Sequence, residues 1–132
     1  MEIDLREFFK SIDLTDKRIL AAAERGMQKV TDDLLQESRK LAPEEDGDLR
    51  NEAHTEVEAK DGRVTGAVVY ATKPKRTKAY TANFSLALYL HEHRPFKDPT
   101  TPGTKPKFLE QPMKRKAERY LKMIADEIAK EL

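Results

Sequence analysis

Apolar residues recur at helical spacing over two long stretches of the chain. Within residues 15–41 they return every three or four positions, which is typical of a helix with one buried face. Pro43 disfavours helical geometry in the residue before it, and Gly26 would let another backbone approach the helix closely. A second stripe occupies residues 113–132, where Pro112 suits the first helical turn. The pattern predicts two long amphipathic helices.

The segment between these helices has the two-residue period of a strand. Residues 49–60 alternate strictly between the two faces of a strand. An Asp-Gly pair at positions 61–62 is the strongest hairpin signal in the chain, and residues 64–71 would form the returning strand. Pairing across this two-residue turn places Ala59 opposite Val64, so that the apolar faces of both strands coincide.

Residues 1–14 form a separate apolar segment. Asp4 followed three residues later by Glu7 is typical of a helix start, and this helix would present Phe8 and Phe9. We expect the resulting arm to pack either on the chain's own core or on a neighbouring molecule.

Three segments between the hairpin and the last helix are less regular. Residues 72–84 predict a basic loop or a ragged hairpin, and residues 85–92 fit either a strand or a short helix. Residues 93–107 contain four prolines, which favours a long exposed loop. Phe108 and Leu109 follow as expected core or interface anchors.

These elements predict a single α+β domain over residues 1–132, with two long helices packed on one face of a small antiparallel sheet and long exposed loops. The chain has no Cys, so we expect neither disulfides nor thiolate chemistry. No apolar run approaches the roughly 20 residues that span a bilayer. Acids stand near the N-terminus where a signal peptide carries bases. We therefore expect synthesis in the cytoplasm and no membrane contact.

Charge is balanced overall but unevenly distributed. The formal net charge is +1, which gives no strong bias towards nucleic acids or anionic membranes. Residues 43–62 nevertheless carry a net charge of −6, and residues 73–119 a net charge of +8. The two regions are either solvated faces of opposite sign or complementary surfaces of neighbouring copies in a head-to-tail ring.

The sequence offers little catalytic chemistry. His91 and His93 flank Glu92, with His54 as a distant further ligand, but a helical zinc site needs histidines at i and i+4. The acids at 44–48 do not match an EF-hand loop, and no Ser sits in a glycine elbow. We expect no catalytic, cofactor-binding or metal-binding residues and no cofactor. A small metal-dependent hydrolase using the two histidines is the enzyme alternative.

A basic segment supports a different alternative. Lys73, Lys75, Arg76 and Lys78, with Tyr80 nearby, could contact phosphate backbones without sequence specificity. The sequence shows no folded DNA-binding motif. The functional alternative is therefore a nucleic-acid-binding accessory protein using this loop, and the simpler reading is a solvated loop.

Three short segments follow one another in a recognisable order: LAPEEDGDLRNE at residues 41–52, ALYLHE at 87–92 and KPKFLEQP at 105–112. In this order they resemble the signature of a tailed-bacteriophage minor capsid and tail-component family, which includes head–tail joining and tail-completion proteins. In that family an alanine-proline follows a long helix, and an acid, a glycine and a leucine-arginine then lead into a strand. Asp48 departs from the resemblance, because a basic residue or serine is common there.

The resemblance implies a structural, non-enzymatic protein of the virion neck or tail. Copies would form or join a homo-oligomeric ring between the portal side of the head and the tail tube, with a monomer as an alternative free form. The virion would be its final location after synthesis in the host bacterial cytoplasm. The residues expected to contact partners or other copies are Glu44, Glu45, Asp46, Asp48, Lys73, Lys75, Arg76, Lys78, His91, Glu92 and His93.

Overall fold

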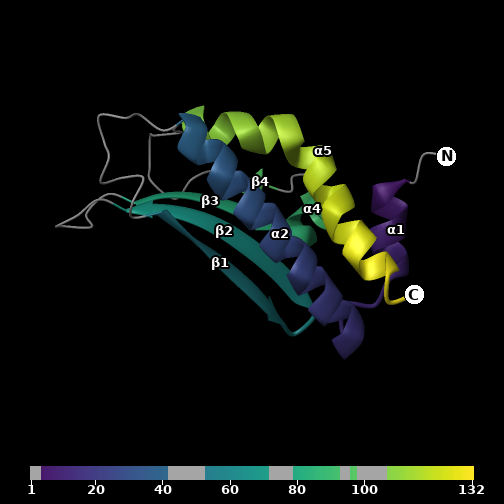
Figure 1. The fold of residues 1–132 in the computed structure, drawn as a ribbon. Helices are drawn as coiled ribbons and strands as arrows, with labels where there is room; N and C mark the ends of the chain where they lie inside the picture. Colours follow the sequence, from purple (N-terminus) through teal and green to yellow (C-terminus); the bar gives the residue numbers. More distant parts are fainter. Residues whose placement is uncertain (1–3, 42–52, 72–78, 93–95, 98–106) are drawn as a thin grey trace.

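The computed structural model describes residues 4–41, 53–71, 79–92, 96–97 and 107–132. Its elements are, in chain order, α1 (Leu5–Ser11), α2 (Lys17–Leu41), β1 (Ala53–Lys60), β2 (Arg63–Ala71), β3 (Ala79–Ser85), α4 (Leu86–Glu92), β4 (Phe96–Lys97) and α5 (Lys107–Ala129). The strands form one antiparallel sheet in the order β1-β2-β3-β4 (Figure 1). The predicted α+β class is confirmed.

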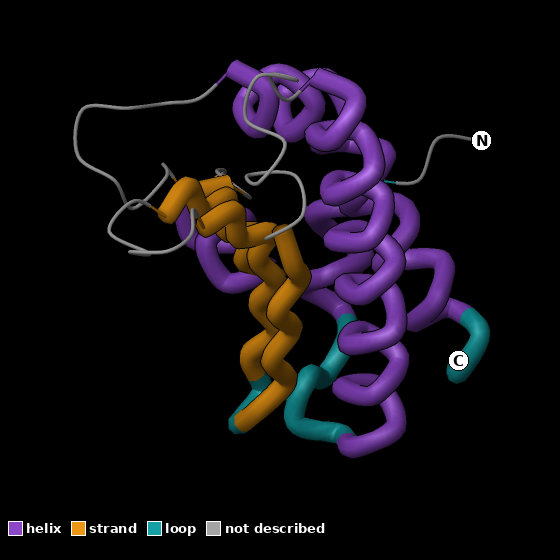
Figure 2. Tube along the Cα trace, turned by 60° about the vertical axis from the view of Figure 1, so that its left-hand side comes forward, coloured by secondary structure: helices purple, strands orange, loops and turns teal. Residues whose placement is uncertain are grey.

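Helix α2 is the central element of the fold. The Asp16 carboxylate accepts hydrogen bonds from the backbone N–H of Arg18 at 2.8 Å and of Ile19 at 3.3 Å, which satisfies two of the free donors at the helix start. The helix lies directly on β1 and β2. Figure 2 shows both long helices on the same side of the strands.

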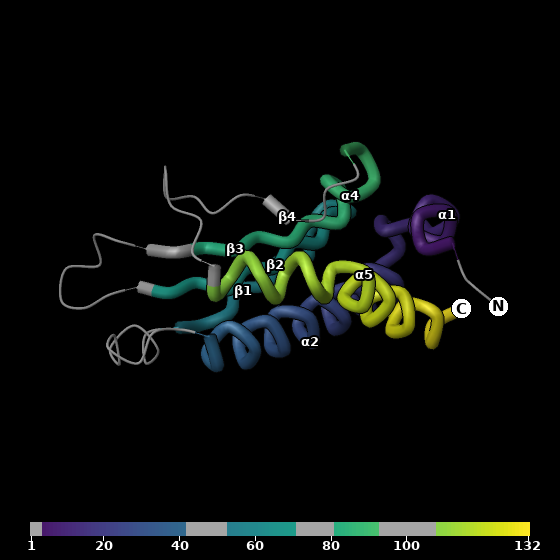
Figure 3. The backbone as a smooth tube through the Cα atoms, turned by 90° about the horizontal axis from the view of Figure 1, so that it is seen from above, coloured from purple at the N-terminus to yellow at the C-terminus, as the bar shows by residue number. Residues whose placement is uncertain are grey.

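Helix α5 packs chiefly on α2 and runs beside it in the opposite direction (Figures 1 and 3). A methyl group at Gly26 would lie 2.7 Å from the Cα of Ile124. The absent side chain therefore allows the two backbones to approach closely, as the sequence predicted. At the other end of the pair, the Phe108 ring meets Tyr70 of β2 edge-to-face, with a centroid distance of 5.1 Å.

The β1–β2 hairpin has the predicted turn and register. Asp61 and Gly62 both have positive φ, 54° and 74°, which is the geometry of a type I′ two-residue turn. Ala59 pairs with Val64, and side chains along β1 alternate between half-buried and exposed. The local turn and the hydrophobic pattern thus specify the same pairing.

The structure settles two open predictions after the hairpin. Residues 79–85 form strand β3 and not a loop, because Ala82 and Phe84 are buried on alternate positions that face the core. The hairpin alternative is thus correct for this part of residues 72–84, and residues 72–78 lie outside the described residues. Residues 86–92 are helical, which excludes a strand there.

The predicted start of the last helix is wrong. Helix α5 begins at Lys107, and Pro112 lies inside it, where proline removes one backbone hydrogen bond. The added turn buries Leu109 completely and brings Phe108 onto the sheet, which offsets that loss. Figure 1 shows α5 changing direction after its first turns, as expected of a helix containing proline. At the other end Leu132, 74% exposed, lies beyond the helix and outside the core.

The N-terminal arm packs on its own chain within the described residues. Asp4 caps α1 by accepting from the backbone N–H of Arg6 at 3.1 Å. Phe9 is buried and meets Tyr89 of α4 edge-to-face, at 6.1 Å between ring centroids. Contacts of α1 with α4 and α5 complete the core at this end.

Candidate functional site

Most residues expected to contact partners lie outside the described parts of the chain. These are Glu44, Glu45, Asp46, Asp48, Lys73, Lys75, Arg76, Lys78 and His93. The structure does place His91 and Glu92, which are exposed at the C-terminal end of α4. A short helix of the folded core therefore presents these two side chains to solvent.

A hydrogen bond, a buried side chain and an aromatic contact hold helix α4 in position. The Ser85 hydroxyl accepts from the backbone N–H of Leu88 at 3.2 Å, and Leu86 is fully buried. Tyr89 packs on Phe9, and burial raises the pKa of its phenol. The metal-site alternative required His91 to lie in a strand, where a second imidazole two residues later would point to the same side. His91 lies in a helix, so this geometry is absent at His91.

The metal-site alternative gains no support from the described residues. Among them, no group of three or more His, Asp and Glu side chains could hold a metal ion. His54 lies on the exposed face of β1, where its Nε2 is 3.0 Å from an Oε1 of Glu56. Its nearest acid is thus its neighbour on the same strand face.

The α2–α5 interface contains an ionic cluster that the sequence did not reveal. The Lys116 ammonium lies 2.9 Å from Asp33 and 2.8 Å from Glu37, and the Tyr120 hydroxyl donates to Asp33 at 2.7 Å. Burial raises the pKa of Asp33, but the hydrogen bonds from Lys116 and Tyr120 outweigh it and leave that pKa below its ordinary value. The hydrogen bonds that Lys116 donates to Glu37 and Asp33 raise the pKa of its own ammonium group.

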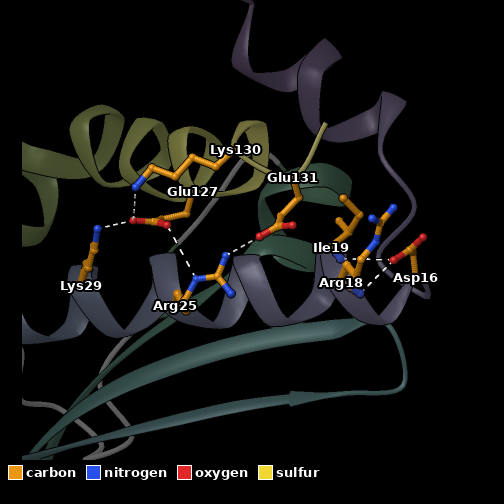
Figure 4. A network of polar contacts seen from close by, with 8 residues as sticks. All are labelled: Asp16, Arg18, Ile19, Arg25, Lys29, Glu127, Lys130 and Glu131. Atoms are coloured by element: carbon orange, nitrogen blue, oxygen red, sulfur yellow. Dashed lines mark hydrogen bonds and ion pairs between the residues drawn. The ribbon is translucent and has the colours of Figure 1, made fainter.

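A second cluster lies nearer the C-terminal end of α5 (Figure 4). The carboxylate of Glu127, whose side chain is 7% exposed, faces Lys29 and Arg25 of α2 and Lys130 of its own helix. Arg25 also reaches Glu131 at 3.0 Å. Hydrogen bonds from Lys29 and Lys130 lower the pKa of Glu127 from 4.5 to about 2.

These clusters reduce the number of basic residues that remain available to pair with acids of another subunit. Part of the basic region 73–119 is paired within the chain, since Lys114 lies 2.6 Å from Glu110 and Arg115 lies 3.6 Å from Glu37. The spacing of Asp33 and Glu37, one helical turn apart, was the only sequence signal for this cluster. Nothing in the sequence identified which basic residues would face them.

At the edge of the sheet, in contrast, acidic side chains lie away from Lys and Arg charges of the described residues. Strand β1 is the outermost strand, and Glu56 and Glu58 are exposed on its outer face. On the neighbouring face of α2, Glu24 and Asp32 are exposed. Among the residues that the structure describes, none of these four acids lies within 4 Å of a Lys or Arg charge. In the sequence, Glu56 and Glu58 are part of the acidic region 43–62, whereas Glu24 and Asp32 belong to the first long helix.

No protein-family model, curated protein or solved structure matches this chain. Within the described parts of the chain, no helix combines the length and the apolarity that crossing a bilayer requires.

Proposed function

We propose that this protein is a structural, non-catalytic subunit of a bacteriophage neck or tail, acting in head–tail joining, tail completion or as a minor capsid protein. One observation carries the proposal. The three segments that resemble the tail-component family follow one another along the fold in the family's order: residues 41–52 connect α2 to β1, residues 87–92 fall in α4, and residues 105–112 lead into α5.

The distribution of chemistry supports a binding role. His91 and Glu92 are exposed at the end of a short helix that packs on the core. Acids at positions 44–48 and bases at positions 73–78 provide opposite charges that neighbouring copies could pair in a head-to-tail arrangement. The mechanism is ring formation through protein–protein contacts, with no cofactor.

Self-association is tested by light scattering after size exclusion, over a range of protein and salt concentrations. Charge reversal at Glu44 and Glu45 to Lys should weaken association, as should reversal of Lys73 and Lys75 to Glu. An equimolar mixture of the two variants should recover it, because each variant keeps one surface for the other. Capture of the proteins encoded by adjacent genes tests the virion role itself. A strict monomer that captures no portal-side or tail-tube protein would contradict the proposal.

The nucleic-acid alternative depends on positions 73–78, which lie outside the described residues, so no observation of the structure favours it. Filter binding to DNA at low salt decides it directly. Retention that disappears in a variant with Lys73, Lys75, Arg76 and Lys78 changed to Gln would favour this alternative, and no retention would eliminate it.

A further inference from the structure

The outer edge of β1 is an open strand edge. Because β1 ends the sheet order, no strand of the described residues pairs with its outer side. The two-residue turn makes Lys60 and Arg63 a hydrogen-bonded pair, and such pairs alternate along an antiparallel ladder. The backbone N–H and C=O groups of Ala53, Thr55, Val57 and Ala59 therefore point outward. These groups can form a ladder with one more strand.

Acidic side chains border this edge on both sides. Glu56 and Glu58 project from the outer face of β1 at alternate positions, and they stand between His54 and Lys60, which are exposed on the same face. On the inner side, the Gln28 amide of α2 donates to the Thr55 hydroxyl at 3.2 Å and to Asp32 at 2.8 Å. This contact places that face of α2 along the edge.

Glu24 continues the inner border, because it lies one helical turn before Gln28 on the same face of α2. It is exposed, as are the acids of the outer border. An incoming strand would consequently find, in the middle, backbone groups that no described residue pairs, and carboxylates on either side.

Charge disfavours one register in which β1 could pair with β1 of a second copy. A two-fold axis at Val57 would place Glu56 of each copy opposite Glu58 of the other, and like charges directly opposite destabilise a strand pair. The acids that disfavour this register attract a strand of opposite charge.

We propose that the β1 edge binds an extended polypeptide segment with basic side chains at alternate positions, which joins the sheet as an added antiparallel strand. Backbone pairing supplies affinity, and Glu56 and Glu58 on the outer face select the basic side chains. This inference does not rest on the proposed virion role, because it concerns only the described edge and the chemistry of its ligand.

The probe is a fluorescent heptapeptide of alternating Lys and Thr, followed by anisotropy against the full-length protein at low salt. In an antiparallel ladder the Lys residues lie opposite Glu56 and Glu58, and the Thr N–H groups face β1. N-methylation of the Thr residues should weaken binding about tenfold or more, and N-methylation of the Lys residues should not. Equal binding of both methylated peptides would reduce the interaction to unspecific charge attraction and overturn the proposal.

Matched protein variants test the same edge. Val57→Pro removes one outward N–H, and Val57→Ala keeps it while losing at least as much side-chain packing, so only the proline variant should lose binding. Replacing Glu56 and Glu58 together by Gln should weaken binding about fivefold at low salt. Glu118→Gln removes an exposed acid from α5 and should leave affinity unchanged. Circular dichroism of each variant establishes folding. Unchanged binding by the Glu56/Glu58 double variant would refute the claim that these acidic side chains select a basic segment.

Discussion

The α2–α5 interface and the β1 edge both contain acidic side chains, but they differ in how many of their polar and charged groups have a partner within the chain. At the interface, Gly26 allows close backbone contact, and the buried Glu127 carboxylate meets charges from α2 and α5. At the edge, the inward side chains of β1 are only half-buried. Within the described residues, Glu56 contacts only His54 of its own strand, and neither Glu56 nor Glu58 has a Lys or Arg partner.

This difference separates stability from recognition. Groups that are already paired within the chain gain little from a partner, because a new contact would have to replace an existing one. Backbone and carboxylate groups without such partners can bind another molecule without disturbing the fold. We therefore expect substitutions at the interface to lower stability, and substitutions along the edge to change binding.

The largest effect should come from removing packing at the interface. Ile124 is fully buried where the two helices cross, so Ile124→Ala should lower the free energy of unfolding by about 3–4 kcal/mol. Val57→Ala, at the half-buried edge, should cost less than about 1.5 kcal/mol. Urea denaturation followed by circular dichroism measures both values. Similar losses in the two variants would contradict the proposed division of roles.

Two glycines should respond differently to the same added methyl group. At Gly26 it would meet the Ile124 backbone at 2.7 Å, whereas at Gly66 it would meet the side chains of Met27 and Thr31 at 2.7 Å. A methionine side chain can move more easily than a helix backbone. Gly26→Ala should therefore cost about 2 kcal/mol and Gly66→Ala about 1 kcal/mol. The same denaturation measurement compares them, and a larger cost at Gly66 would show that the helix pair can separate at low cost.

The charge cluster around Glu127 should be visible in the pH dependence of stability. Its pKa falls from 4.5 to about 2 in the folded protein, so the ionised carboxylate stabilises the fold above pH 4.5. That contribution is lost as the pH falls from there towards 2. Thermal unfolding of the parent protein and of Glu127→Gln should differ most near pH 7 and converge towards pH 2. A difference that does not change with pH would assign the effect of the substitution to packing, with Glu118→Gln as the control for losing an acid from α5.

The sequence predicted the features that depend on residues close to one another along the chain. The stripe of α2, the Asp61-Gly62 turn and the register of Ala59 with Val64 all follow from local spacing. The start of α5 was missed because a tertiary contact, the burial of Leu109, outweighs the local preference of Pro112.

The candidate site was less predictable than the fold for a similar reason. Lys116 and Glu127 find their partners on α2, about 80 and 100 residues away in the chain, and composition cannot show which charges are paired. The sequence placed acids in the 43–62 region. Only the sheet order shows that Glu56 and Glu58 lie on an outermost strand.

The smallest effect on stability should come from the acidic edge itself. Glu58 is exposed on β1, and surface substitutions of this kind usually change stability by less than about 0.5 kcal/mol. Glu58→Gln should therefore unfold like the parent protein at pH 7, where Glu127→Gln already shows its full loss. Both variants remove one carboxylate, so their difference reports pairing and not charge number. If Glu58→Gln destabilised the protein as much as Glu127→Gln, the edge acid would have a structural role, and it would no longer be available to select a basic partner.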